Sequence, residues 1–171
     1  MRIVGYVREA SDPSDGRTAF SQQEQIRRYA SEHGHQLVAL CQDLRTPGRS
    51  PARDGYLSLL GVIASGGVDA VIIPGISTFS SDAIVQEVML WDLQARGVRI
   101  ISTDPADLGL LDRESAPEPS RMVIRDVLER VGEHTTSVGA HRIDPPGILP
   151  DGDVLVHIIE ADAAEQGLSD G

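Results

Sequence analysis

The sequence predicts an α/β fold, in which a mainly parallel sheet of four to five strands carries helices on both faces. Short apolar runs alternate with segments of helical period along the first hundred residues, and the loops between them are short and contain Gly or Pro. The run "VDAVIIP" at residues 68–74 is almost continuously apolar, which is typical of a central strand buried on both faces. This alternation favours parallel strands joined by crossover helices.

Four strands are expected in the parallel part of the sheet, because four segments rich in Val, Ile and Leu lie between turn-forming residues. They cover residues 2–8, 35–43, 68–74 and 98–103. Function in such sheets usually lies at the carboxyl ends of the strands. Those ends fall near Arg8, Asp43, Pro74 and Thr103.

Three helices are expected between these strands, at residues 21–34, 53–67 and 81–97. The first has Ser21 as its N-cap, Glu24 to complete a capping box and Gly34 to end it. The second has four apolar side chains on one face, which predicts that it packs on the sheet. These side chains are Tyr56, Leu59, Leu60 and Ile63.

The chain changes character after the fourth strand. Residues 104–120 are rich in Pro and acidic residues and are expected to form a loop, and residues 120–137 follow with helical periodicity. We expect residues 1–137 to form one domain. Residues 138–171 are expected to be a Pro-containing linker, a strand at 153–159 and an acidic tail.

The charge of the chain is acidic and uneven. The formal net charge is −11, and residues 101–171 hold 5 Arg against 15 Asp and Glu. Because DNA is a polyanion, this balance predicts weak or absent DNA binding. No run approaches the ~18 consecutive apolar residues of a membrane-spanning helix, so no membrane contact is expected.

Cysteine and histidine do not indicate a metal or redox site. The single cysteine, Cys41, lies in the apolar run "LVALC" and is expected to be a buried thiol. One cysteine excludes an internal disulfide and fits a cytoplasmic location. His33 and His35 flank Gly34 at a helix end, where surface histidines are favoured, and the other histidines lack metal-ligand spacing. We therefore expect no metal and no cofactor.

Motifs of a known family occur in order along roughly the first 135 residues. In sequence order they are "MRIVGYVREASD", "SQQEQIRRYASEHGHQLVALCQD", "RDGYLSLLGVIASGGVDAVIIP", "LQARGVRIIST" and "RMVIRDVLERV". The chain resembles the catalytic domain of serine recombinases, the resolvase and invertase group. The resemblance implies a resolvase-like sheet followed by the family's long dimer helix.

The resemblance also locates the positions that carry the family's chemistry. In this family a serine attacks a DNA phosphodiester and forms a covalent phosphoserine link, while arginines hold the phosphate. The position of that nucleophile is occupied here by Ala10. The family's aspartate and two further arginines are replaced by Ser77, Thr78 and Ser81.

Three positions of the family's phosphate-binding set are retained, namely Arg8, Gln25 and Arg53. Phosphodiester attack needs an activated oxygen and cations around the phosphate, and losing one charge-stabilising donor commonly costs about 10²–10³ in rate. We therefore expect a catalytically inactive domain, a pseudo-resolvase that acts as a protein-interaction or regulatory module with an unidentified protein partner.

Two alternatives remain open. In the first, the chain is an active site-specific serine recombinase that cuts DNA through Ser11. Adjacent strand residues point to opposite sides, so this hydroxyl would need a bulge to re-aim it. In the second, Arg8, Arg53 and the loop at residues 75–82 bind a small phosphate-containing ligand.

The helix at residues 120–137 indicates self-association. Its apolar side chains recur on one stripe, and these are Ile124, with Val123 as the alternative, Val127, Leu128 and Val131. The stripe must be buried either on the sheet of its own chain, which would leave a monomer, or against the same helix of a second chain. The family's corresponding helix builds its dimer, so the resemblance implies a homodimer held by this stripe.

Overall fold

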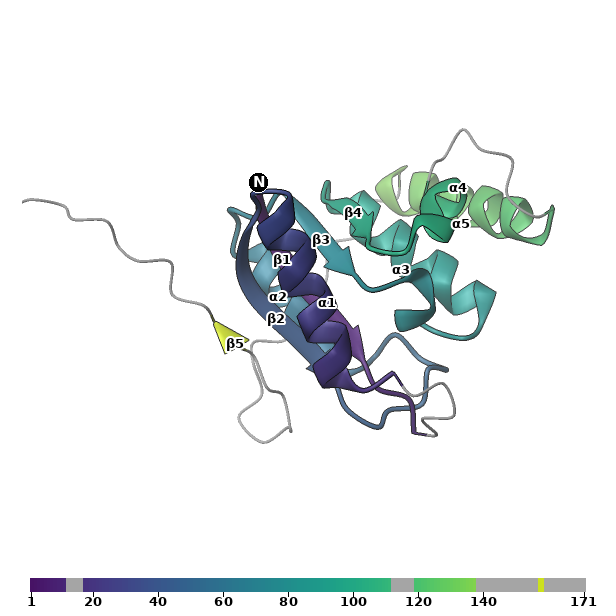
Figure 1. Ribbon diagram of the computed structural model, residues 1–171. Helices are drawn as coiled ribbons and strands as arrows, with labels where there is room; N and C mark the ends of the chain where they lie inside the picture. Colours follow the sequence, from purple (N-terminus) through teal and green to yellow (C-terminus); the bar gives the residue numbers. More distant parts are fainter. Residues whose placement is uncertain (12–16, 112–118, 138–156, 159–171) are drawn as a thin grey trace, which may run out of the picture.

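The computed structural model describes residues 1–11, 17–111, 119–137 and 157–158. Its centre is a five-stranded sheet in the order β4-β3-β1-β2-β5 (Figure 1). The strands are β1 (Arg2–Arg8), β2 (Gln36–Asp43), β3 (Ala70–Ile73), β4 (Arg99–Ser102) and β5 (His157–Ile158). The first four strands are parallel and β5 is antiparallel to β2. The predicted mainly parallel sheet is therefore confirmed.

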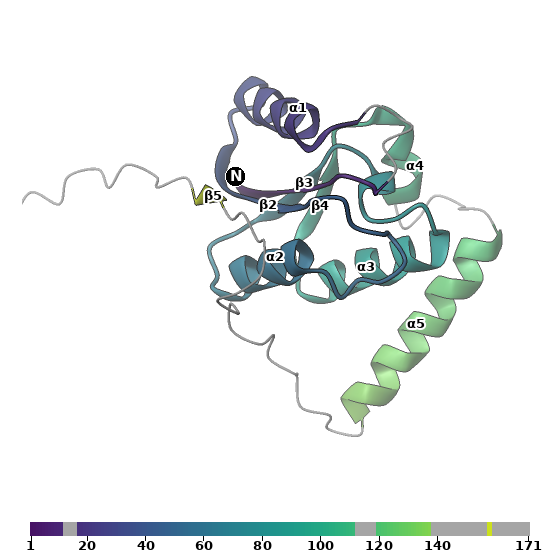
Figure 2. The same cartoon turned by 90° about the horizontal axis from the view of Figure 1, so that it is seen from below.

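Helices cover both faces of this sheet. Helix α1 (Ala19–Glu32) lies on one face, and α2 (Asp54–Ala64) and α3 (Ala83–Ala95) lie on the other (Figure 2). The core under α1 contains Ile3, Val7, Ile26, Leu40 and Ile72. The opposite core contains Val4, Tyr6, Cys41, Tyr56, Leu59, Val71, Ile73, Phe79, Met89 and Leu93. All of β3 is buried, as its continuous apolar run predicted.

Helix α1 begins earlier than the sequence indicated. Its N-cap is Thr18, whose side chain accepts a hydrogen bond from the Ser21 amide at 3.2 Å. The prediction of Ser21 as N-cap was wrong, because its hydroxyl instead donates to the Thr18 carbonyl at 2.9 Å. Burial of Ala19 in the core under α1 extends the first turn. The helix ends at Glu32, and Gly34, the predicted stop residue, follows the cap residue His33 with a φ of 63°.

The region after β4 contains more structure than the predicted loop. Two short 3₁₀ turns flank the strand ends, η1 (Ile76–Thr78) after β3 and η2 (Pro105–Asp107) after β4. Helix α4 (Leu108–Leu111) continues directly from η2. The side chain of Asp104 accepts a hydrogen bond from the Ala106 amide at 3.0 Å. This N-cap begins η2, in a segment whose Pro and acidic residues had predicted only a loop.

The C-terminal helix is present where its periodicity placed it. Helix α5 (Pro119–Ser137) follows α4 along the chain. Among the described residues, no helix is both long and apolar enough to cross a membrane. Of the strand expected at residues 153–159, the structure describes His157 and Ile158 as β5, paired with Leu40 and Ala39. The rest of the C-terminal extension lies outside the described residues.

Candidate functional site at the carboxyl end of β1

The side chain of Arg8 joins three separate segments at the carboxyl end of β1. Its Nε donates to the Thr78 carbonyl at 2.8 Å, and its Nη2 donates to the Ser77 carbonyl at 3.3 Å. Its Nη1 donates to the Thr46 carbonyl at 3.1 Å. The guanidinium therefore ties β1 to the turn after β3 and to the loop after β2.

The backbone of Arg8 is fixed by Gln22, a residue that the sequence analysis missed. The Arg8 amide donates to Gln22 Oε1 at 3.2 Å, and Gln22 Nε2 donates to the Arg8 carbonyl at 2.8 Å and to the Arg17 carbonyl at 3.1 Å. Gln22 is only 4% exposed. The available signal was its place on the same helical face as Ile26, since a glutamine on an apolar face needs partners there.

Arg53 lies deeper than Arg8 and is 6% exposed. Its Nη2 donates to the Phe79 carbonyl at 2.8 Å, and its Nε lies 3.9 Å from a carboxylate oxygen of Asp43. Its guanidinium carbon is 5.9 Å from the ring centroid of Tyr6. Nε and Nη1 are buried with no hydrogen-bond partner among the described residues, so the Asp43 carboxylate and the Tyr6 ring supply the stabilisation of this charge.

The Asp43 carboxylate is itself held by two donors. It accepts the Tyr6 hydroxyl at 2.7 Å and the Gly55 amide at 2.8 Å. Burial, and next the negative charge of Asp43, raise the pKa of Tyr6 well above its ordinary value. Tyr6 therefore remains a protonated donor, and Asp43 serves as an anionic cap for the first turn of α2.

Neither Ala10 nor Ser11 offers an oxygen to the two arginines. Ala10 is half-buried and carries only a methyl group. Ser11 is exposed, and its hydroxyl donates to the Arg45 carbonyl at 3.1 Å, in the loop that follows β2. The strand end thus directs this hydroxyl to a neighbouring backbone group.

Gln25, the third retained position, contacts a different part of the fold. It is exposed, and its Nε2 donates to the Thr103 hydroxyl at 2.7 Å. Thr103 in turn donates to the Pro74 carbonyl at 3.1 Å. Gln25 therefore links α1 to the ends of β3 and β4.

The turn after β3 and the residues that follow it contain Ser77, Thr78 and Ser81, which the resemblance aligns with charged positions of the family. Thr78 is buried, whereas Ser77 and Ser81 are exposed. The Ser77 hydroxyl lies 3.5 Å from Nη1 of Arg17. None of the three side chains carries a charge, so the turn contributes main-chain carbonyls to the arginines.

The apolar stripe predicted on α5 is partly buried within the chain and partly exposed to solvent. Ile124 and Leu128 are half-buried within the single chain. Val127 and Val131 are 51% and 49% exposed, and Val123, the alternative to Ile124 on the stripe, is 65% exposed. The exposed row at positions i, i+4 and i+8 is therefore Val123, Val127 and Val131, which we call the valine row.

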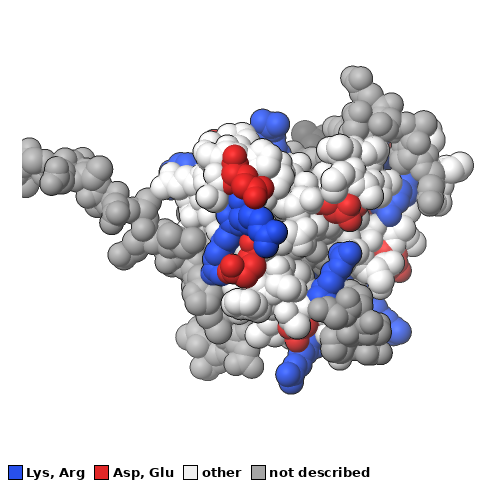
Figure 3. Space-filling view, viewed as in Figure 1, with Lys and Arg blue, Asp and Glu red and all other residues white. Residues whose placement is uncertain are grey.

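The described residues offer no metal site and no broad basic surface on the face that carries α1. No group of three or more His, Cys, Asp or Glu side chains in the described part of the chain could hold a metal ion. Burial raises the pKa of Cys41 from 9.0 to about 12, which keeps it a neutral thiol. Figure 3 shows acidic and basic side chains interspersed on this face. Within α1, Arg27 and Glu24 form an ion pair at 2.8 Å.

Comparison with solved structures shows the same fold. The chain superposes on the N-terminal catalytic domain of TP901-1 integrase with a TM-score of 0.56 at 16% identity, covering 81% of this chain and 98% of that one. A resolvase family site-specific recombinase from Streptococcus pneumoniae gives 0.52 at 19% identity, with 81% and 93% covered. The C-terminal catalytic domain of ISC1926 TnpA, an IS607-like serine recombinase, gives 0.51 at 18% identity, with 81% and 86% covered.

Sequence comparison identifies the family directly. Among curated proteins, none matches the chain significantly. The family model for the resolvase N-terminal domain matches residues 3–139, which is most of the chain. The match includes β1 to β4, the Arg8 site and α5. The chain therefore belongs to the resolvase N-terminal domain family, as its resemblance to serine recombinases predicted.

Proposed function

We propose that this chain is a catalytically inactive serine-recombinase-like domain that acts as a protein-interaction or regulatory module. One observation carries the proposal. Arg8 donates to the carbonyls of Thr46, Ser77 and Thr78, beside a strand end that has Ala10 where the family resemblance places the nucleophile.

The chemistry of phosphoryl transfer supports this proposal. An attacking oxygen must be activated, and the charge that develops on the phosphate must meet preorganised cations. Ala10 has no oxygen to activate. The Arg8 guanidinium meets main-chain carbonyls, and those carbonyls would have to move before a phosphate could replace them.

Arg53 supports the same conclusion for a separate reason. Its charge lies beside the buried Asp43 carboxylate, and its Nη2 is engaged by the Phe79 carbonyl. A phosphate drawn to Arg53 would be repelled by that carboxylate, which is 3% exposed and poorly screened by solvent. The structure thus favours a structural role for this arginine over anion binding.

A cleavage assay tests the proposal. The protein is incubated with supercoiled plasmids that bear candidate sites from its own genome, and the products are examined for nicks and for phosphoserine adducts. We expect neither from the wild type nor from Ala10→Ser, because the side chains at positions 77, 78 and 81 remain uncharged. A covalent adduct that disappears in Ser11→Ala would overturn the proposal and establish the active-recombinase alternative.

A separate thermal-unfolding assay tests the phosphate-ligand alternative. The unfolding temperature is measured with and without inorganic phosphate or nucleotides. A ligand present at 100 times its dissociation constant stabilises the folded state by about 2.7 kcal/mol. We expect no rise, and a saturable rise that Arg53→Met abolishes would favour the ligand-binding function instead.

We also propose that the module forms a homodimer through α5, in addition to binding an unidentified protein partner. Support comes from the valine row, since three valines at least 49% exposed on one helical row favour burial against another apolar surface. We further propose that residues 1–137 are the functional domain, with 138–171 as an extension. A cytoplasmic location is supported by the single, buried Cys41 thiol.

A further inference from the structure

A buried ionic cluster joins α5 to α3. At its centre is Glu87, whose side chain is 2% exposed. Its Oε1 accepts Arg121 Nη1 at 2.8 Å, and its Oε2 accepts Arg125 Nε at 2.8 Å. Arg121 also donates to Gln86 Oε1 at 2.6 Å, and Arg125 donates to the Leu110 carbonyl of α4 at 2.7 Å.

Both arginines come from the first two turns of α5, and both depend on one carboxylate. The Arg121 side chain is 10% exposed and the Arg125 side chain is 21% exposed. Removing one member of a buried ionic cluster leaves the others desolvated without compensation, which is strongly unfavourable. The position of α5 on α3 therefore depends on Glu87 more than on any exposed ion pair of the helix.

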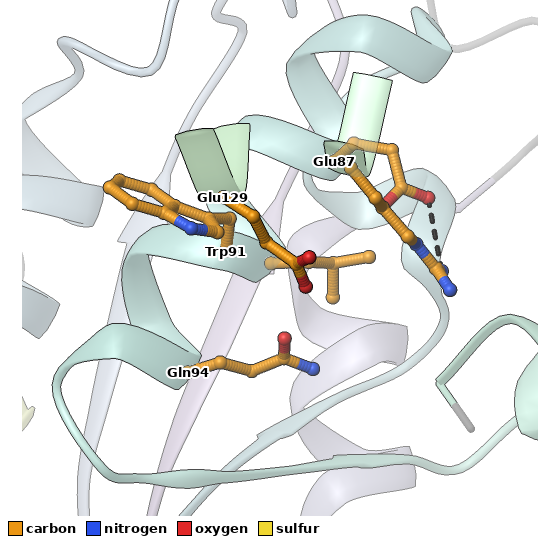
Figure 4. Close-up of a pocket in the computed structure, with 6 residues that line it drawn as sticks. Glu87, Trp91, Gln94 and Glu129 are labelled. Carbon is orange, nitrogen blue, oxygen red and sulfur yellow. Dashed lines mark hydrogen bonds and ion pairs between the residues drawn. The ribbon is translucent and has the colours of Figure 1, made fainter. Parts of the chain in front are cut away.

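The apolar part of the same contact centres on Trp91. A Cβ atom added to Gly132 of α5 would lie 3.0 Å from Trp91 Cζ2, so the helix backbone passes close to the indole ring. Figure 4 shows Glu87, Trp91 and Glu129 around the small hollow between the helices. Its cavity volume of about 20 Å³ holds about one water molecule and no larger ligand.

Most of the apolar surface of α5 does not contribute to this contact. Met122 is 53% exposed and the valine row is 49–65% exposed. Ile124 and Leu128 are half-buried, but the other large apolar side chains of the described helix remain about half exposed or more, so the buried polar cluster is a principal contact of α5 with α3. We infer that Glu87 is a latch: it holds α5 against α3 through Arg121 and Arg125, and its loss releases α5 while the sheet stays folded.

The test uses Trp91, which is the only tryptophan of the chain. Glu87→Gln keeps the side-chain shape and removes the charge. In this variant we expect amide exchange in α5 to rise by roughly 100- to 1,000-fold, because the two buried arginines lose their compensating charge. Trp91 emission should shift to the red, and the exchange of amides in β1, β2 and β3 should not change.

Two further variants make the result specific. Arg125→Met keeps the aliphatic stem and one arginine on Glu87, so it should give a smaller effect in the same direction. Arg130→Gln is the control, because Arg130 lies on the same helix in a 2.9 Å pair with Asp126 whose side chains are 75% and 58% exposed. It should leave both signals at their wild-type values.

Two results would overturn the latch. In the first, Glu87→Gln leaves the exchange of α5 and the emission of Trp91 unchanged. In the second, the sheet and α5 lose protection together, which would make Glu87 a general core residue. The inference rests on contacts within one chain and does not depend on self-association. The measurements are made at a concentration at which light scattering shows a monomer.

Discussion

The guanidinium of Arg8 donates a 2.8 Å hydrogen bond to the main-chain carbonyl of Thr78, a residue 70 positions later in the chain. Arg53 makes the equivalent contact with the next carbonyl, that of Phe79, at 2.8 Å. The two arginines thus bind consecutive carbonyls of the turn after β3. This arrangement connects the end of β1 and the start of α2 to that turn.

Arg8→Met is expected to lower the free energy of unfolding by about 2–3 kcal/mol, because hydrogen bonds from a charged donor contribute about 1.5–3 kcal/mol and several are lost together. Urea unfolding followed by circular dichroism measures the loss. Arg28→Met, on the exposed side of α1, serves as the control and should change stability by less than about 0.5 kcal/mol. Wild-type stability in Arg8→Met would mean that the three carbonyl contacts do not stabilise the fold.

Gly55→Ala and Gly61→Ala should have opposite effects, although both lie in α2. A Cβ at Gly55 would overlap the Gln42 carbonyl, and the shift would disturb the amide that holds Asp43. A loss of about 1–3 kcal/mol is expected. A Cβ at Gly61 meets nothing within 4 Å, so alanine there should stabilise the helix by about 0.5–1 kcal/mol. Thermal unfolding measures the stability of the two variants. Equal changes in unfolding temperature would contradict the close approach of Gly55 to the Gln42 carbonyl.

Alkaline pH should destabilise the protein through Cys41. The pKa of the thiol is raised from 9.0 to about 12 by burial, so the unfolded chain loses this proton first. The contribution of the protonated Cys41 thiol to the free energy of unfolding is complete below about pH 9. It is lost as pH rises towards 12, at up to ~1.4 kcal/mol per pH unit. Cys41→Ala should show a shallower decline than the wild type in urea titrations between about pH 8 and 11. Parallel declines would show that the thiol does not titrate differently in the folded state.

The wild type is expected to self-associate at tens of micromolar, and Val127→Asp should weaken this association by roughly 100-fold, which corresponds to about 2.7 kcal/mol. An aspartate in the valine row places an unpaired charge in an apolar contact. Analytical ultracentrifugation provides the measurement. Leu128→Asp is the comparison, because Leu128 is half-buried within the single chain and its change should also lower the unfolding temperature. A monomeric wild type would remove α5 as the contact surface.

Binding to duplex DNA should be undetectable at roughly micromolar protein in physiological salt, because electrostatic association needs clustered cations that release counterions. The net charge of −11 opposes such association. Fluorescence anisotropy with random-sequence duplexes at two salt concentrations gives the measurement. A footprint at a defined sequence that survives competitor DNA would contradict this prediction.

The sequence predicted the fold because its strongest patterns follow from burial. The four residues of β3 are apolar and buried on both sides, so their sequence alone indicates a central strand. Burial patterns in the sequence did not identify the first residue of α1. Thr18 and Ser21 are both suitable caps, and the choice depends on the packing of Ala19 in the core.

The sequence indicated Arg8 and Arg53 as candidate site residues, and their partners are seen only in the structure. Arg8 and Arg53 stand where the resemblance placed them, yet their acceptors are main-chain carbonyls, which side-chain patterns do not reveal. Helix α5 shows a related limit. Leu128 and Val127 are neighbours in sequence, about 100° apart around the helix, and only the position of α3 determines which of them faces solvent.

The use of carbonyl acceptors by Arg8 has an evolutionary consequence. Every residue type supplies a main-chain carbonyl, so substitutions at Ser77 and Thr78 leave the acceptors of Arg8 in place. Selection for a stable fold can therefore retain this arginine while the side chains around it drift. Any use of Arg8 to bind a phosphate would require its withdrawal from hydrogen bonds that connect three segments of the domain. Each of these bonds therefore sets the stability of the fold against anion binding at this strand end.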